Sequence, residues 1–364
     1  MGNIALKFTC CSSLRCLETS KEQQSIPLEI VMEILSWLPV KYVLRMKCVC
    51  KQWYALTQDR HFIEKHMSRV TNIARFYNTR IINPLIGGGG NGEIFQLICG
   101  CNGLLLEKSN ASKKYYIKNF ATRKILELPE PHKNSFGMTF SFVPSTGWFK
   151  LVSVYDDNKE AGIEGCEILT IGSDNSWRTL NFPNLNDANK KREKIMVVSA
   201  GEAVHCIKVN KVGTRFCADM VSLDLESESF KGTIMPKYLF SDWEKVWALD
   251  WNGSLSFAVR VEEVINVMVL EDYKKLKWGK EKIVVPLAFM NSTSELMGDL
   301  VPLFARSGDL WFWEKFKKLM AYNIESGMIK YTIAVAEWSR IPKGAVYIGP
   351  SSLITLKGMQ PVGK

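Results

Sequence analysis

The sequence of 364 residues predicts a multi-domain protein, with a small all-helical part followed by a larger all-β part of β-propeller type. Two observations support this prediction. Apolar residues recur at helical spacing before residue 70 and in short runs bounded by turns after it. Turn signals in the second part also repeat about every 50 residues, as expected for repeated sheets of several short strands.

The first helix is expected between Pro27 and Pro39. Proline suits the first turn of a helix, where its missing N–H would have no partner anyway. The residue before a proline avoids helical geometry, so Pro39 ends the segment. Between the two prolines, the apolar positions form one stripe at helical spacing: Ile30, Val31, Ile34, Leu35 and Leu38.

Further helices are expected over residues 41–48 and 51–58, and in a short piece after Asp59, which can cap its N-terminus. Three short helices over about 40 residues make too small a core to stand alone comfortably. The stripe of the first helix is also wide for so few neighbours. We therefore expect this part to have a permanent binding partner.

In the β part, four turn pairs recur at Asn102-Gly103, Ala200-Gly201, Asn252-Gly253 and Ser307-Gly308. The last three glycines are 52 and 55 residues apart, but Gly103 lies 98 residues before Gly201. The missing member is expected at the turn signal of residues 144–147, which gives five or six blades. Strands near 71–82 and 345–356 are expected to close the ring and remove its open edges.

Ten strands are expected from runs of apolar and β-branched residues bounded by turn signals. They are 103–106, 115–117, 150–154, 166–171, 204–209, 220–224, 255–259, 264–270, 310–313 and 319–323. Residues 310–313 (LWFW) are apolar on both faces, which is typical of a strand covered on both sides. Trp243, Trp247 and Trp251 crowd one segment, where core packing is favoured over an aromatic binding face.

Residues 24–68 resemble an F-box. The segments IPLEIV (26–31), EILSWLPV (33–40) and RMKCVCKQWY (45–54) match its signature almost throughout. The resemblance implies docking on the Skp-type adaptor of an SCF ubiquitin ligase, with an apolar helix face against partner helices. The residues that it assigns to this contact are Pro27, Ile30, Ile34, Leu35, Leu38, Pro39, Val40, Leu44, Val49, Cys50 and Trp53. Lys41, Arg45, Lys47 and Lys51 would steer an acidic adaptor onto the surface.

Residues 95–330 resemble the F-box-associated domain of plant F-box proteins, which is kelch-like. The matching segments are CNGLL (101–105), NFATR (119–123), SWR (176–178) and residues 220–230. The expected organisation is a flexible tail (1–23), the F-box (24–68), a linker with a Gly-rich loop (69–93) and a β-propeller-like domain (94–356). The plant family includes pollen receptors for self-incompatibility ribonucleases, and the sequence does not decide whether the chain belongs to that branch.

Together, the two resemblances imply the substrate-recognition subunit of an SCF-type ligase. The F-box would bind the adaptor and, through it, cullin and RING subunits, while the β domain would bind an unidentified protein target for ubiquitination and degradation. The chain itself is expected to be non-catalytic and to act in the cytoplasm or nucleus. Two alternatives stay open: a scaffold or glycan- or protein-binding module outside the ligase, and a basic nucleic-acid binder.

Other sequence features do not change this interpretation. The net charge of +10 favours acidic partners without choosing among them, and basic clusters at 190–194, 274–282 and 315–318 are expected to be solvated loops. No run of about 18 uncharged apolar residues is present. Membrane contact is expected only if Gly2, Cys10 and Cys11 are acylated, and Leu6 stands where acylation motifs have Ser or Thr.

Nor is a cofactor, a metal or a catalytic group expected. Gly87, Gly89 and Gly92 match the dinucleotide fingerprint, but the residues after them have no helical character. The cysteine pairs 48/50 and 99/101 have one residue between them, fewer than paired zinc ligands have. His205 and Cys206 are neighbours on a strand and point to opposite faces. The cysteines are expected to be reduced.

Overall fold

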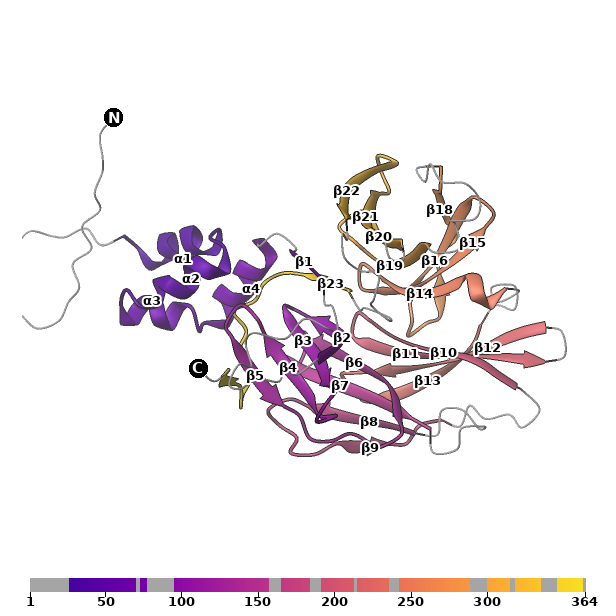
Figure 1. Cartoon of the computed structure of the whole chain (residues 1–364), viewed down its shortest axis with the longest axis horizontal. Helices are drawn as coiled ribbons and strands as arrows, with labels where there is room; N and C mark the ends of the chain where they lie inside the picture. Colours follow the sequence, from indigo (N-terminus) through magenta and orange to yellow (C-terminus); the bar gives the residue numbers. More distant parts are fainter. Residues whose placement is uncertain are drawn as a thin grey trace, which may run out of the picture.

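A computed structural model describes residues 26–69, 73–76, 95–156, 165–183, 191–212, 215–235, 242–288, 300–314, 318–334 and 346–362. The predicted tail (1–23) and the Gly-rich loop (87–92) lie outside these residues. The chain forms a helical domain at one end and a much larger β domain beside it (Figure 1). No helix among the described residues is long and apolar enough to cross a membrane.

Four helices form the first domain: α1 (Leu28–Ser36), α2 (Val40–Met46), α3 (Lys51–Leu56) and α4 (Arg60–Arg69). The prolines that were expected to bound the first helix are N-caps, because α1 starts directly after Pro27 and α2 directly after Pro39. The carbonyl of Pro39 accepts the amide of Tyr42 at 2.8 Å. The capping role of Asp59 is confirmed, since its Oδ1 accepts the amide of Phe62 at 2.9 Å.

The β domain consists of consecutive antiparallel sheets, called blades here. Blade 1 contains β2 (Phe95–Cys101), β3 (Leu104–Ser109), β4 (Tyr115–Asn119) and β5 (Lys124–Glu127), with β24 (Gln360–Pro361) added at its edge. Blade 2 contains β6 (Ser135–Val143), β7 (Trp148–Tyr155), β8 (Gly165–Thr170) and β9 (Arg178–Leu180). Blade 3 contains β10 (Lys191–Ala200), β11 (Ala203–Val212), β12 (Arg215–Asp224) and β13 (Ser229–Ile234).

Strands β14 to β22 form one nine-stranded sheet that divides into two blades. Blade 4 contains β14 (Val246–Trp251), β15 (Ser254–Val261), β16 (Val264–Asp272), β17 (Lys277–Trp278) and β18 (Ile283–Pro286), and a short 3-10 helix (Trp243–Lys245) precedes it. Blade 5 contains β19 (Leu300–Arg306), β20 (Asp309–Glu314), β21 (Lys318–Asn323) and β22 (Met328–Ala334). The two blades join where β14 and β19 run parallel over two residue pairs.

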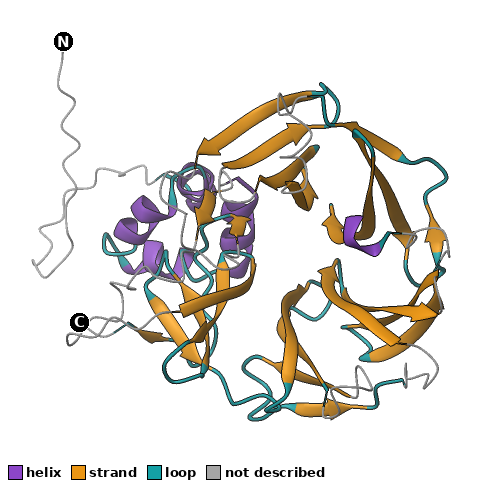
Figure 2. Cartoon of the chain, turned by 45° about the vertical axis from the view of Figure 1, so that its right-hand side comes forward, coloured by secondary structure: helices purple, strands orange, loops and turns teal. Residues whose placement is uncertain are grey.

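The predicted turn repeat is the blade repeat. Each of the five turns, including the one expected at 144–147, joins the first strand of a blade to its second. The backbone there is left-handed, with φ of 49° at Asn102, 50° at Asn252 and 54° at Ser307, followed in each case by glycine. The first strands of successive blades touch, in the order β2, β6, β10, β14 and β19. Figure 2 shows the sheets arranged in a ring, which confirms the β-propeller-like fold.

Beside blade 1, β1 (Ile73–Phe76) pairs antiparallel with β23 (Val346–Gly349), and β23 contacts β2. The sequence predicted that strands from these two regions pair, but they form a separate two-stranded sheet, so the expected closure of the ring by these strands is not seen among the described residues. β1 lies inside the segment expected to be a linker, and β24 lies beyond the expected domain end at 356. β24 pairs with a segment more than 200 residues away, and the local sequence pattern gave no signal for it.

The cores of the β domain lie between neighbouring blades. Leu310 and Phe312 of β20 are fully buried against blade 4, while Trp311 and Trp313 on its other face are partly buried. The predicted coverage is therefore found on one face, while on the other Trp311 stacks on Phe304 and Tyr331 of the same sheet. Trp251 is buried in the same core and Trp247 packs against it, so these two are core residues, as favoured. The side chain of Trp243 lies outside the described part.

Candidate docking surface on the helical domain

The helical domain has a small core to which all four helices contribute. The buried apolar side chains are Val31, Leu35, Val40, Val43, Leu56 and Phe62, and Leu353 from the C-terminal segment joins them. α1 therefore turns Val31 and Leu35 inward, which leaves its other apolar positions facing out.

The outer face of α1 and the residues at its two ends carry four large apolar side chains. Ile26, Ile30, Ile34 and Trp37 expose 63%, 50%, 55% and 65% of their surface. The spacing of four and three residues from Ile30 to Ile34 and Trp37 places these three along one side of the helix, while Ile26 precedes the N-cap Pro27. An exposed apolar row of this kind on a small domain marks an interaction site.

A second exposed group lies at the corner between α2 and α3. Val49 is 40% exposed there, and Cys48 and Cys50 are exposed as well, while Tyr42 in the first turn of α2 is 46% exposed. The Cys50 sulfur accepts the amide of Trp53 at 3.5 Å and so caps α3. These residues extend the apolar surface of the helical domain beyond α1.

The structure places the predicted contact residues in three environments. Six are exposed: Pro27, Ile30, Ile34, Pro39, Val49 and Cys50. Three are partly buried: Leu38, Leu44 and Trp53. Leu35 and Val40 are only 3% and 5% exposed, inside the core of the domain. Leu35 and Val40 therefore stabilise the helices that carry the surface, because their side chains pack against neighbouring helices in the core.

Ile26, Trp37 and Tyr42 are exposed apolar residues that the sequence reasoning did not assign to the surface. A signal for one of them was present. Trp37 continues the row of Ile30 and Ile34 at helical spacing, and Ile26 stands at the start of the F-box segment just before the helix. The wide stripe hid this signal, because it combined the inward row of Val31 and Leu35 with the outward row.

Trp37 is held in place by charged neighbours. Its Nε1 donates to Glu33 at 3.2 Å, and the Arg69 guanidinium lies 4.5 Å from the ring centre. Glu33 also binds Lys65 at 2.6 Å and Arg69 at 2.7 Å, which ties α1 to α4. Hydrogen bonds from Lys65 and Arg69 lower the pKa of Glu33 to about 2, so the carboxylate stays ionised.

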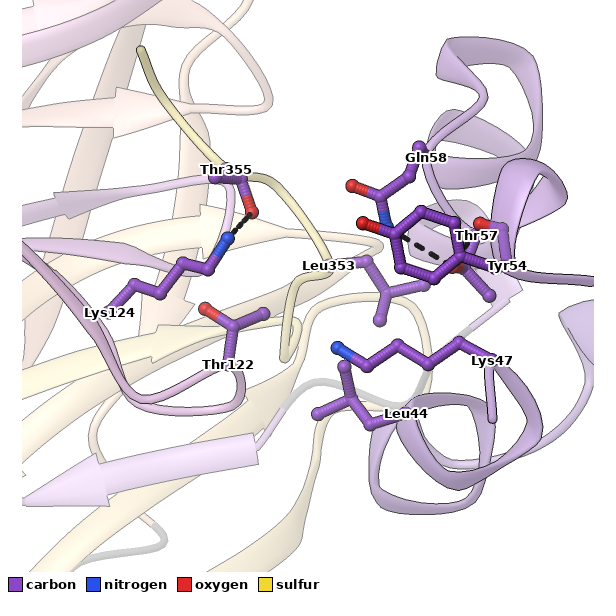
Figure 3. Close-up of a pocket in the computed structure, with 9 residues that line it drawn as sticks. All are labelled: Leu44, Lys47, Tyr54, Thr57, Gln58, Thr122, Lys124, Leu353 and Thr355. Atoms are coloured by element: carbon purple, nitrogen blue, oxygen red, sulfur yellow. Dashed lines mark hydrogen bonds between the residues drawn. The ribbon is translucent and has the colours of Figure 1, made fainter. Parts of the chain in front are cut away.

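The predicted basic residues divide between two sides of the domain. Lys41, Arg45 and Lys51 are exposed, and among the described residues they have no acidic partner. Lys47 instead lines a small cleft of about 50 Å³ between the helical domain and the β domain (Figure 3). Three free positive charges therefore remain beside the apolar surface, where they favour an acidic partner.

His66 is fully buried under α1 and α2. Its Nε2 donates to the carbonyl of Leu38 at 2.8 Å, and its Nδ1 has no hydrogen-bond partner among the described residues. Burial lowers the pKa of His66, so the ring is neutral in the folded domain.

The cysteine pairs have no further metal ligands gathered around them in the part of the chain that the structure describes. No group of three or more potential metal ligands occurs among the described residues. Burial raises the pKa of Cys99 and of Cys101 to about 12, which makes both thiols unreactive. His205 is also buried, and its Nδ1 contacts the Ser222 hydroxyl at 2.8 Å. The Gly87–Gly92 fingerprint lies outside the described residues.

Comparison with protein families identifies both domains. The model of the F-box associated beta propeller domain matches residues 90–329, and that of the F-box domain matches residues 24–65. The chain belongs to the F-box-associated β-propeller family. F-box domains generally bind Skp-type adaptors, and the two domains together support the role of a substrate receptor. Neither matching family is a catalytic one.

Several F-box proteins of Arabidopsis thaliana are similar to this chain. One F-box protein is 23% identical over 346 residues, covering 87% of this chain and 93% of its own. Another is 24% identical over 303 residues, covering 74% and 73%. A third, an F-box/WD-40 repeat-containing protein, is 38% identical over only 99 residues, or 24% of each chain.

Solved structures resemble the chain only distantly. The WD40 domain of SCAP from fission yeast aligns with a TM-score of 0.31 at 10% identity, covering 72% of this chain and 59% of its own. An exo-beta-1,3-galactanase from Phanerochaete chrysosporium gives 0.39 at 6% identity, with 76% and 71% covered. Scores at this level support no conclusion about function.

Proposed function

We propose that the chain is the substrate-recognition subunit of an SCF-type ubiquitin ligase. The F-box docks on a Skp-type adaptor and, through it, joins cullin and RING subunits. The propeller holds a protein target for ubiquitination and degradation. The observation that carries the proposal is the outward row of α1, Ile30, Ile34 and Trp37, in which each side chain is at least half exposed, with the exposed Ile26 just before the helix.

Docking would remove this row from water. Fully burying an isoleucine side chain contributes about 1.5–3 kcal/mol, so Ile30 and Ile34 are each worth part of that range. Lys41, Arg45 and Lys51 lie on the adjoining helices and would speed the approach of an acidic adaptor. Leu35 and Val40 would contribute indirectly, by keeping α1 and α2 packed.

The test is binding of the full chain to a Skp-type adaptor, with wild type compared with Ile34→Asp. A charge at a position that docking buries costs several kcal/mol, so we expect affinity to fall at least about 100-fold. His61→Asp is the matched control, since it adds the same charge to an exposed position of α4 outside the proposed surface. Its affinity should stay within about twofold of wild type.

Two outcomes would contradict the proposal. The first is a wild-type chain that does not bind the adaptor; the second is an Ile34→Asp chain that binds as tightly as wild type. Adaptor binding without ubiquitin transfer in a reconstituted ligase would favour the scaffold alternative. Tight nucleic-acid binding that weakens steeply with salt would favour the third interpretation.

A further inference from the structure

The C-terminal segment, residues 346–362, crosses from the propeller to the F-box and back. It lies outside both family matches, which end at residues 65 and 329. Along its length it contributes buried side chains to three separate apolar cores. This segment, called the strap here, therefore joins the two domains by packing in addition to the covalent connection between α4 and β1.

The strap begins in the ring of the propeller. In β23, the Tyr347 ring lies on Gly100 so closely that a Cβ there would come within 2.3 Å of the ring. The amide of Gly103 donates to the Tyr347 hydroxyl at 2.8 Å. Tyr347 is 9% exposed and packs with Leu97 and Leu105 of blade 1.

The next part of the strap is held by Asn119, at the end of β4. The Asn119 side-chain NH₂ donates to the carbonyls of Ser352 at 3.0 Å and Ile354 at 2.8 Å. Its Oδ1 accepts the amides of Ala121 and Thr122 at 2.9 and 3.1 Å. Asn119 is 1% exposed, so one buried side chain both caps its own turn and fixes the strap.

Between these two carbonyls, Leu353 enters the core of the F-box. It is 5% exposed and belongs to the same cluster as Leu35, Val43 and Phe62. Figure 3 shows Leu353 between the side chains of α2 and α3 on one side and Thr122 and Lys124 on the other. The strap thus adds one apolar side chain to the core that the F-box helices form.

The strap then returns to blade 1. Leu356 and Met359, 9% and 7% exposed, pack into the core shared by blades 1 and 2. Gln360 pairs with Ile125 at the edge of β5. The amide of Val362 donates to the carbonyl of Arg123 at 3.0 Å. Leu353 is therefore anchored to the propeller on both sides.

We propose that residues 346–362 fix the orientation of the F-box on blade 1, and that adaptor docking does not require the strap. The second half rests on the proposed function. A rigid connection between two binding sites sets the effective concentration that a ligand bound at the first site has near the second. A flexible connection averages that concentration over many relative positions of the two sites. The strap would thereby hold a propeller-bound target at a constant position relative to the adaptor.

Asn119→Asp weakens the anchoring of the strap on blade 1 and leaves Leu353 and every residue of the F-box helices unchanged. Aspartate keeps the oxygen that caps the turn, as Asp224 and Asp272 do at the corresponding turns of blades 3 and 4. Aspartate lacks the NH₂ donor of Asn119. Its carboxylate would face the carbonyl oxygens of Ser352 and Ile354 and repel them. We expect hydrogen exchange at the Val362 amide to become at least tenfold faster in the full chain. Thr355→Asp, an exposed change within the strap, is the control and should exchange like wild type.

Orientation is tested by small-angle X-ray scattering of the full chain carrying Asn119→Asp and Leu353→Ala. We expect a larger radius of gyration than in wild type, and adaptor affinity of Asn119→Asp within twofold of wild type. Wild-type exchange at Val362, unchanged scattering of the double variant, or loss of adaptor binding by Asn119→Asp would each overturn the proposal. If wild type itself binds no adaptor, the proposed function fails, while exchange and scattering still decide the role of the strap.

Discussion

At the scale of single residues, His66 makes the stability of the F-box depend on pH. Burial lowers the pKa of His66 below its ordinary value of 6.5, whereas the unfolded chain titrates near 6.5. Below that pH the unfolded chain therefore binds a proton that the folded domain does not, and stability falls as pH falls.

We expect His66→Gln, which keeps a donor for the Leu38 carbonyl, to flatten this dependence between pH 7.5 and 5. Thermal unfolding of both chains measures it; equal slopes would contradict the assignment. The pKa of Glu33 is lowered from 4.5 to about 2, so its contribution to stability is lost mainly below pH 5, outside this range.

At the scale of the element, the two faces of α1 should separate stability from binding. Leu35 is 3% exposed in the core, so Leu35→Ala should cost about 2–5 kcal/mol of unfolding free energy. Ile34 is 55% exposed, and Ile34→Ala should change stability by no more than about 0.5 kcal/mol. Chemical denaturation compares the two. Similar losses of stability would show that α1 does not divide into inner and outer faces.

The same scale shows what the sequence could predict. The turns between first and second strands were predictable because left-handed backbone selects Asn and Gly, as at Asn102 and Gly103. A second repeat was missed: Asn119, Asp224, Asp272 and Asn323 each accept backbone amides at the turn between third and fourth strands. Its spacing is interrupted at blade 2, so no regular period was visible. On α1, spacing alone predicted the helix but could not tell which apolar row faces inward.

At the scale of the whole molecule, contacts between residues far apart in the sequence determine features of the fold that local sequence patterns do not predict. Leu353 belongs to the F-box core although about 280 residues of sequence separate it from those helices. The pairing of Gln360 with Ile125 likewise depends on where the folded ring leaves an edge. The resemblance to two families predicted both domains, but the strap lies in neither match, so the way in which the domains are joined emerged only from the structure.

The ring itself is held by close contacts between the turns of neighbouring blades. A Cβ on Gly201 would lie 2.6 Å from the carbonyl oxygen of Gly253, and Gly201 has φ of 61°. The next turn is linked similarly, since the amide of Ser307 donates to Asn252 at 3.1 Å.

Gly201→Ala should therefore separate blades 3 and 4 and lower the free energy of unfolding by about 1–3 kcal/mol. Gly232→Ala is the matched control, because nothing lies within 4 Å of its Cβ, and it should stay within about 0.5 kcal/mol of wild type or stabilise slightly. Denaturation of the full chain measures both variants; a Gly201→Ala chain as stable as Gly232→Ala would mean that this contact between turns does not hold the blades together.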